Sequence, residues 1–192
     1  MALFRSVGEP ELVVKGQSVL LRPPQMSDHE AWAELREESR DFLTPWEPVW
    51  PADDLTRAAF RRRLRRYEED QRTDQAYAFL VFRNGDNALL GGITLANLRR
   101  GVAQAGSIGY WVGARYARQG VMTAAMQALV PFAFDSLRLH RLEAACIPTN
   151  AASVALLEKS GFVREGYARE YLCINGVWAD HLLYARLRGD AA

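Results

Sequence analysis

The stretch "IGYWVGARYARQGVMTAAMQALVPFAF" (residues 108–134) joins two different hydrophobic patterns across a short polar turn. Its first part belongs to the strand-like run "AGSIGYWVG", and its last part has the apolar spacing of a helix. We expect that helix to bend or end early at Pro131, because proline cannot donate a backbone hydrogen bond inside a helix. A strand that leads into a helix through a polar turn predicts a mixed α/β layer architecture. The buried side of the helix is expected to hold Met122, Met126, Leu129, Val130 and Ala133.

The turn "YARQGVMT" (residues 116–123) is placed to bind an anion. A loop that enters a helix exposes the first N–H groups of that helix, which have no partners within it. These groups and the helix dipole together favour a negative ligand. Gly120 allows a ligand to approach the backbone closely, while Arg118 and Gln119 add charge or donors. The pattern suits a phosphate or pyrophosphate, although one glycine before a helix is also typical of a plain turn.

With the remaining patterns, the expected order of elements along the chain is β-α-α-β-β-β-α-β-α-β-β. We expect Asn150 to cap the helix over residues 150–161 and Gly161 to lie just past its end. The patterns predict a mostly antiparallel sheet of six to seven strands, flanked by helices. The other expected elements are a strand at 18–23, a helix from Ser27 whose capping box includes Glu30, a helix from Asp54 to about Asp70, strands at 76–82 and 88–98 around Asn84–Gly85, a strand at 140–147, and two final strands around Asn175–Gly176.

The segment "FLTPWEPVWP" (residues 42–51, the cap segment below) interrupts this order with three prolines, two tryptophans and a phenylalanine. Each proline removes a donor and restrains the residue before it, so the segment cannot be regular secondary structure. We therefore expect its aromatic side chains to pack as an irregular cap on another part of the molecule.

Size and composition indicate a single domain over residues 1–192, with a core at about 18–187. Hydrophobic residues make up 49% and charged residues 24% of the chain, as in folded globular proteins. A net charge of +1 gives no general attraction to nucleic acid or membranes. No apolar run approaches the roughly 20 residues of a membrane span, and "MALFRSVGEPELVVKG" lacks the apolar part of a signal peptide. Cys146 and Cys173 show neither metal-ligand nor disulfide spacing, so we expect no metal and a cytoplasmic location.

The run "RRRLRR" (Arg61–Arg66) raises the question of nucleic acid binding. On a helix, Phe60, Leu64 and Tyr67 would face inward and the arginines outward, near Glu68, Glu69 and Asp70. A solvated helix face with local ion pairs is the simpler interpretation. A patch that faces the ribosome or an acidic peptide is the alternative, and an RNA-binding module is the function that it would indicate.

Residues 108–134, followed by "RLEAACIPTNAASVALLEKSGFVREG" (residues 141–166), resemble the acetyl-CoA-binding core of the GNAT superfamily of N-acetyltransferases. In particular they resemble the branch of RimJ/RimL-type enzymes, which acetylate the N-termini of ribosomal proteins. The resemblance covers about residues 18–187 in the family's order of elements. It implies the GNAT fold, whose central strands splay apart to admit the coenzyme, with acetyl-CoA as the acetyl donor and coenzyme A as a product.

The resemblance also implies which residues bind the coenzyme. The family's pyrophosphate-binding pattern, Gln/Arg-x-x-Gly-x-Gly/Ala, falls on residues 117–122, where Gly120 is kept but Ala117 and Met122 depart from it. Backbone groups of the strand before the turn would pair with the pantetheine arm, and one N–H there would polarise the thioester carbonyl. The expected coenzyme-binding residues are Trp111, Val112, Arg118, Gln119, Gly120, Val121, Met122, Thr123, Asn150 and Ser153.

Acetyl transfer needs an unprotonated amine, a donor to the carbonyl oxygen and a proton for the leaving thiolate. Many GNAT enzymes supply that proton from a tyrosine seven residues after the asparagine, where this chain has Leu157. Ser153 matches a serine that RimL-type enzymes hold near the sulfur, and it is the first expected catalytic residue. Glu47, in the cap segment, is the second, as general base. Glu170, His181 and a water relay are alternatives for the base.

These observations predict an N-acetyltransferase that acts on the N-terminal α-amine of a protein, of the ribosomal-protein alanine type. One alternative acceptor is a small-molecule amine, such as an antibiotic, a polyamine or an amino sugar. Another alternative is a non-catalytic acetyl-CoA-binding protein, because the family tyrosine is absent. We expect no membrane and no direct nucleic acid partner, and the sequence leaves open a monomer or a homodimer.

Overall fold

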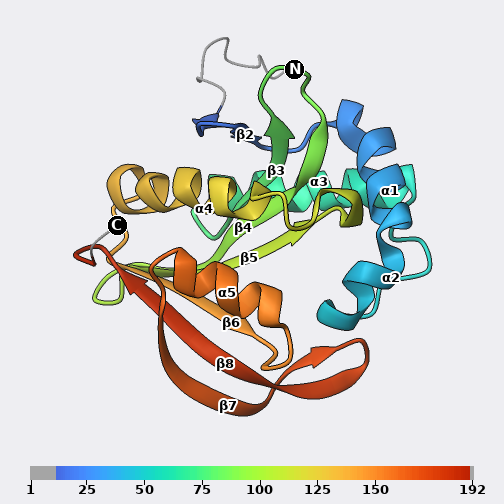
Figure 1. Cartoon of the computed structure of the whole chain (residues 1–192). Coiled ribbons are helices and arrows are strands. Elements are labelled where there is room, and N and C mark those ends of the chain that lie inside the picture. The colour runs from blue at the N-terminus through green and yellow to red at the C-terminus, as the bar shows by residue number, and fades with distance from the viewer. Residues whose placement is uncertain (1–11, 191–192) are drawn as a thin grey trace.

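The computed structural model describes residues 12–190, and it is built around one eight-stranded sheet (Figure 1). The strands lie in the order β1-β2-β3-β4-β5-β6-β8-β7, and every neighbouring pair is antiparallel except β5–β6. The mostly antiparallel sheet is therefore confirmed, with one strand more than expected. The strands are β1 (Val14–Lys15), β2 (Val19–Arg22), β3 (Tyr77–Arg83), β4 (Leu89–Arg99), β5 (Ala105–Val112), β6 (Arg141–Cys146), β7 (Val163–Ile174) and β8 (Val177–Leu187).

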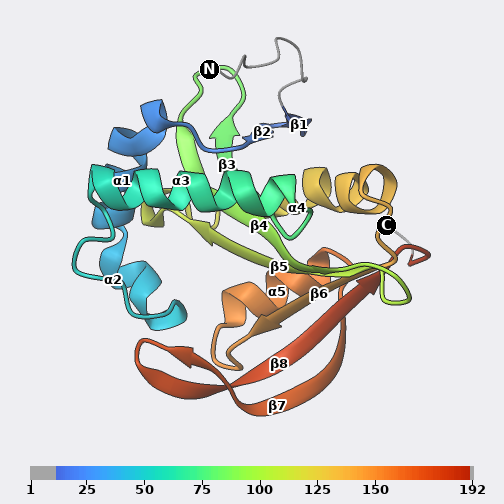
Figure 2. The ribbon, with the colours of Figure 1, turned by 180° about the vertical axis from the view of Figure 1, so that it is seen from behind.

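Helices cover both faces of the sheet. Figures 1 and 2, which show opposite sides, place α4 and α5 over one face and α1 and α3 over the other. As expected, α4 ends at Pro131, and a wider π-helical turn (Phe132–Ser136) follows. The helices are α1 (His29–Glu38), α2 (Arg40–Leu43), α3 (Arg57–Arg72), α4 (Val121–Pro131) and α5 (Ala151–Lys159), with 3-10 turns at Met26–Asp28, Thr44–Trp46 and Ala114–Tyr116.

Each face of the sheet carries its own hydrophobic core. Because side chains alternate along a strand, neighbouring residues of β5 enter different cores. Tyr110 packs against the core beneath α4 and α5, whereas Trp111 packs against the core beneath α1 and α3. Gly92 makes room for Trp111, since a Cβ atom at Gly92 would lie 2.4 Å from the indole nitrogen. The bulky pair that ends β5 therefore ties both layers to the strand that enters the predicted coenzyme turn.

The parallel pair β5–β6 is joined over three positions only, from Ala105↔Arg141 to Ser107↔Glu143. Beyond Ser107, β5 stays paired with β4 as far as Val112, while β6 stays paired with β8 as far as Cys146. The two strands thus diverge, and their facing backbone groups are not paired with each other along this part. The predicted splay at the centre of the sheet is confirmed.

Two predicted helix starts are wrong. Asp28, and not Ser27 with Glu30, organises the entry to α1: its carboxylate accepts from the N–H of Gln25 at 2.7 Å and forms a bidentate pair with Arg22 at 2.6 and 2.8 Å. The next helix begins at Arg57 instead of Asp54, since Thr56 caps it by accepting the Ala59 N–H at 3.2 Å. The Asp28 contacts thus fix the 3-10 turn before α1, whereas the Thr56 hydroxyl caps a free N–H group of α3 itself.

Two other local predictions are confirmed. Asn150 caps α5, with its Oδ1 accepting the Ser153 N–H at 3.1 Å, and Gly161 follows the helix with a φ of +76°. Asn175 and Gly176, both with positive φ, form the turn between β7 and β8. Within residues 12–190, no helix is long and apolar enough to cross a membrane.

Candidate active site

The turn between β5 and α4 presents an uncapped helix end to the outside. The chain reverses through left-handed conformations at Arg118 (φ 60°) and Gly120 (φ 77°), and α4 begins at Val121. Gln119 closes the turn by donating from its side chain to the Arg115 carbonyl at 2.8 Å. No side chain caps α4, so the N–H groups of its first turn point out of the helix end and are able to bind an anion.

Gly120 lies at the open side of this turn. A Cβ atom at this position would meet nothing within 4 Å, so glycine is needed for the positive φ and not to avoid a protein neighbour. Arg118 and Gln119 are exposed beside it, whereas the Met122 side chain is 8% exposed and packs into the core. Met122 can therefore contribute its backbone but not its side chain to a ligand, which explains why a large residue is tolerated there.

The N–H groups of β5 alternate between the β4 side and the side that faces the diverging β6. Gly113, just past the strand, donates its N–H to Leu90 of β4 at 2.9 Å. Since backbone N–H groups alternate between the two edges of a strand, Val112 points the other way, toward the diverging side. The Trp111 N–H points toward β4, as the Gly113 N–H does. Of the two backbone donors considered from the sequence, the alternation favours Val112.

A pair of hydroxyl groups lies at the diverging side of β5. Tyr110 Oη is 2.7 Å from Ser153 Oγ, which joins β5 to the first turn of α5. Burial raises the pKa of Tyr110 to about 12, while the hydrogen bond with Ser153 acts in the opposite direction. Burial likewise raises the pKa of the nearby Cys146 thiol, and a hydrogen bond with Ser153 lowers it. Ser153 is thus the centre of a small, protonated polar group in apolar surroundings.

Sequence reasoning treated Tyr110 as a sheet residue and Cys146 as an isolated cysteine. Their contact with Ser153 depends on the spacing between β5, β6 and α5, which no local pattern encodes. The alternation of side chains did carry one signal, because it puts Tyr110 on the same face of the sheet as α5.

Glu47 is held within the cap segment by a full set of contacts. Its carboxylate receives Arg36 through two nitrogens, at 2.9 and 2.6 Å, and the indole N–H of Trp50 at 2.7 Å. Its backbone carbonyl accepts the N–H of Asn175, in the β7–β8 turn, at 2.8 Å. The cap segment is irregular, as expected, apart from one 3-10 turn at Thr44–Trp46.

The other residues considered for the base lie elsewhere on the β7–β8 hairpin. His181 is 3% exposed, and its Nδ1 lies 2.9 Å from the Ala179 carbonyl in its own strand. Glu170 sits in an irregular part of β7 with a φ of 45°, and its N–H donates to Asp180 at 2.8 Å. No group of three or more His, Cys, Asp or Glu residues suited to a metal ion occurs between residues 12 and 190.

The arginine run lies on α3 as the helical pattern predicts. Phe60 and Leu64 are buried, and Arg61, Arg62, Arg65 and Arg66 are exposed. Arg62 pairs with Asp53, and Arg63 pairs with Asp54, so the local ion pairs come from the residues before the helix. The run is a helix face that is partly neutralised by its neighbours.

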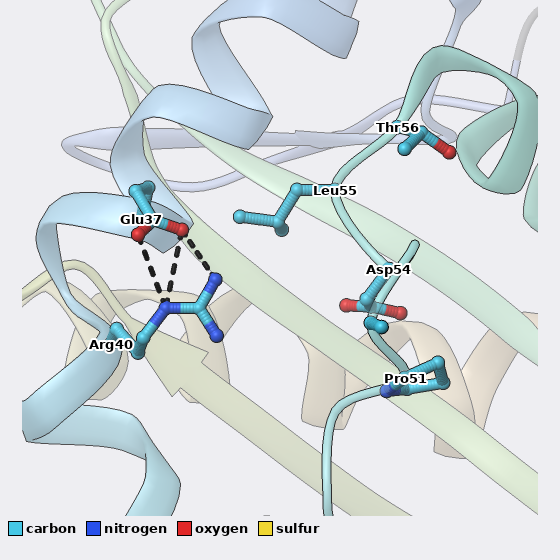
Figure 3. A pocket seen from close by; sticks show the side chains of 7 residues that line it. Glu37, Arg40, Pro51, Asp54, Leu55 and Thr56 are labelled. Carbon is cyan, nitrogen blue, oxygen red and sulfur yellow. Dashed lines mark hydrogen bonds and ion pairs between the residues drawn. The ribbon is translucent and has the colours of Figure 1, made fainter.

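A separate hollow of about 360 Å³ lies on the outer side of the cap segment (Figure 3). Figure 3 shows Glu37 and Arg40 paired at one side of it, facing Asp54 and Leu55. None of the residues of the β5–α4 turn lines this hollow, and neither does Ser153. The hollow is therefore distinct from the β5–α4 turn.

The comparison with protein families assigns this arrangement to a known class. Residues 18–163 match the acetyltransferase (GNAT) domain, and the chain therefore belongs to the GNAT family of N-acetyltransferases. Enzymes of this family use acetyl-CoA. The uncapped start of α4 and the diverging strands fit that coenzyme, because they offer donors for phosphates and free backbone groups for an extended arm.

Two relatives and one solved structure are similar to this chain over most of its length. The probable N-acetyltransferase YjcK of Bacillus subtilis (strain 168) is 37% identical over 178 residues, which are 93% of this chain and 98% of that protein. The ribosomal protein uS5-alanine N-acetyltransferase of Escherichia coli (strain K12) is 34% identical over 165 residues, or 85% of each chain. Among solved structures, Mycobacterium smegmatis RimJ in complex with CoA-disulfide superposes with a TM-score of 0.85 and 30% identity, covering 93% of this chain and 87% of that one.

Proposed function

We propose that this protein transfers the acetyl group of acetyl-CoA to the N-terminal α-amine of a protein, of the ribosomal-protein alanine type. The observation that carries the proposal is the divergence of β5 and β6, which runs from the open end of α4 to Ser153. The similarity to the uS5-alanine enzyme over most of both chains supports the choice of acceptor. We also propose a single catalytic domain and a cytoplasmic location, where ribosomal proteins are made.

We propose that the coenzyme binds along this divergence. Its pyrophosphate would lie at the N–H groups of Gly120, Val121, Met122 and Thr123, with the Arg118 and Gln119 side chains beside it. Its pantetheine arm would pair with the free edge of β5 near Trp111 and Val112. Asn150 uses one lone pair of its Oδ1 to cap α5, so its amide NH₂ and the second lone pair of Oδ1 are left for the coenzyme.

In the proposed reaction, the neutral amine attacks the thioester carbon, so that a C–N bond forms and the C–S bond breaks. The Val112 N–H donates to the carbonyl oxygen, where negative charge develops. The Ser153 hydroxyl donates to the departing thiolate. Either hydroxyl of the Tyr110–Ser153 contact could be its donor, and we assign Tyr110 as the donor, which leaves the serine proton for the sulfur. The Tyr110 hydroxyl thereby supplies part of what the family tyrosine would give at Leu157.

The proton of the attacking amine needs an acceptor. Glu47 remains a candidate, and a water relay is the alternative. The apolar cap segment over the acceptor side would keep the amine poorly hydrated, which favours the neutral, reactive form. Phe42, Trp46 and Val49 are its exposed apolar side chains.

The test is thiol release from acetyl-CoA with a panel of acceptors, confirmed by mass spectrometry of the product. The panel holds peptides that begin with Ala, Ser, Met and Asp, together with spermidine, glucosamine and an aminoglycoside. We expect release with the alanine peptide, and its N-acetyl form as the product. Release with a small amine alone would replace the proposed acceptor. Tight acetyl-CoA binding without turnover of any acceptor would contradict the proposal.

A further inference from the structure

Arg36 is a buried cation enclosed by aromatic rings and by one carboxylate. Its residue is 5% exposed, and its guanidinium carbon lies 4.1 Å from the centre of the Trp50 ring and 5.0 Å from that of Trp111. A third ring, Trp32, lies at 6.0 Å. The two terminal nitrogens both bind Glu47. A planar guanidinium can stack on rings and bind a carboxylate in a bidentate manner at the same time, which a lysine cannot do.

These contacts join four parts of the molecule, of which only α1 and the cap segment are neighbours in the sequence. Arg36 belongs to α1, Trp50 and Glu47 to the cap segment, and Trp111 to β5. The backbone of Glu47 adds the β7–β8 turn through Asn175. Figure 1 shows this turn directly below α2, at the end of the sheet where β5 and β6 diverge. The Arg36–Glu47 pair therefore fixes where the cap segment lies relative to the strand that carries the coenzyme.

The same contacts bear on whether Glu47 is a base. Oε1 accepts from Arg36, and Oε2 accepts from both Arg36 and Trp50. A carboxylate has about four acceptor positions, and three of these are filled. Taking a proton from an amine would neutralise the carboxylate and so weaken its pair with the buried guanidinium, which holds the cap segment.

We infer that Arg36 is the positioning residue of the acceptor side, and that Glu47 acts as its partner instead of as the general base. This inference rests on the proposed function, because it assigns the cap segment to acceptor binding. The pair holds Trp50 over the guanidinium, while Trp46 and Val49 remain at the surface, and Val49 lies beside Gly176 of the β7–β8 turn. A loosened pair would let the cap segment move, which would weaken acceptor binding more than the chemical step.

The test compares Glu47→Gln with Glu69→Gln. Glu69 pairs with Arg72, but that pair is exposed and both residues belong to α3, so Glu69 serves as the matched control. For Glu47→Gln we expect the KM for the peptide acceptor to rise about tenfold, with kcat within about threefold of the wild type. The pH profile of kcat should keep its rising limb, and the affinity for acetyl-CoA should be unchanged. The control should match the wild type.

A second variant and a measurement without turnover keep the inference open to refutation. Arg36→Lys keeps the positive charge but cannot bind the carboxylate through two nitrogens, so it should show the same rise in the KM for the peptide acceptor. A KM equal to that of the wild type would show that the bidentate contact is not needed. Hydrogen exchange of residues 44–50 and of the Asn175 amide should speed up at least tenfold in Glu47→Gln, while the core stays protected. Failure of the proposed function would appear instead as a wild-type enzyme that acetylates none of the peptides, whatever the exchange shows.

Two results would refute the inference. If Glu47→Gln lowers kcat more than about 100-fold and abolishes the rising limb of the pH profile, Glu47 is the base. If exchange at the cap segment speeds up but the acceptor KM does not change, the cap segment does not position the acceptor.

Discussion

The two sides of the proposed site are formed by different kinds of chemical group, backbone N–H groups on the coenzyme side and side chains on the acceptor side. On the coenzyme side, the start of α4 and the edge of β5 offer backbone N–H groups, and few side chains crowd them. On the acceptor side, the cap segment has almost no regular hydrogen bonding and is held by the side chains of Arg36, Glu47 and Trp50. Backbone groups tolerate changes in sequence, whereas a side-chain cluster depends on each member. The comparison suggests why a family can keep one coenzyme and vary its acceptors.

Gly120→Asp tests the coenzyme side and should have the largest effect. A carboxylate would face the proposed pyrophosphate position, and the positive φ strains any side chain. We expect the affinity for acetyl-CoA to fall about 100-fold, measured by isothermal titration calorimetry. Gly85→Asp is the matched control, because Gly85 also has a positive φ and open space around it but lies in the β3–β4 turn. Equal affinities in both variants would place the phosphates elsewhere.

Ser153→Ala tests the point where the two sides meet. Removing the hydroxyl takes a donor from the departing thiolate, so we expect kcat to fall between about 10- and 100-fold, with acetyl-CoA affinity within about threefold. Steady-state kinetics and calorimetry on the same preparation separate the two effects. Ser160→Ala, at the other end of α5, is the control, since the buried Ser160 hydroxyl has no hydrogen-bond partner in the described structure. A parallel loss of affinity and turnover would make Ser153 a binding residue.

Ser39→Ala tests whether a change in α1, on the acceptor side, alters binding on the coenzyme side. Ser39 ends α1 and is 1% exposed, and its hydroxyl accepts the Ala114 N–H at 2.9 Å, in the turn that leads to α4. The variant would leave a buried N–H without a partner, which costs about 1–3 kcal/mol. We expect a lower Tm by scanning calorimetry and an acetyl-CoA affinity about fivefold weaker. A lower Tm with unchanged affinity would mean that α1 does not influence the coenzyme turn.

The coenzyme side could be predicted from the sequence because its determinants are local. Gly120 before an apolar helical pattern and Asn150 before another one are short-range signals, and the structure places both residues at helix starts. The divergence of β5 and β6 came from the family resemblance, and the strand pairing confirms it. The eighth strand was missed, since two residues, Val14 and Lys15, cannot show an alternating pattern.

The acceptor side could not be predicted in the same way. Prolines and aromatic residues indicated an irregular cap. Nothing in the sequence, however, indicates that Glu47 contacts Arg36 of α1 or Asn175 of the β7–β8 turn. For the same reason the contact between Tyr110 and Ser153 was not predicted. Contacts between distant segments depend on how the helices lie on the sheet, and single-sequence patterns do not record this.

Tyr110→Phe should give the smallest effect and concerns stability at high pH. Burial raises the pKa of Tyr110 to about 12, so the folded state favours the neutral phenol. The stability that depends on this neutral form is complete below pH ~10, the ordinary pKa of tyrosine, and is lost as the pH rises toward about 12. Urea unfolding at neutral pH and near pH 11 should show a smaller alkaline loss for the variant than for the wild type.

Tyr77→Phe is the matched control for this last comparison. Burial also raises the pKa of Tyr77, the first residue of β3, to about 12. The Tyr77 hydroxyl, however, donates to Asp74 and not to Ser153. Both variants should therefore lose less stability at alkaline pH than the wild type. Only Tyr110→Phe should also lower kcat, by about threefold, because Ser153 loses its hydrogen-bond partner. If the two variants behave alike in turnover as well, the Tyr110–Ser153 pair serves packing only, and the serine must act without it.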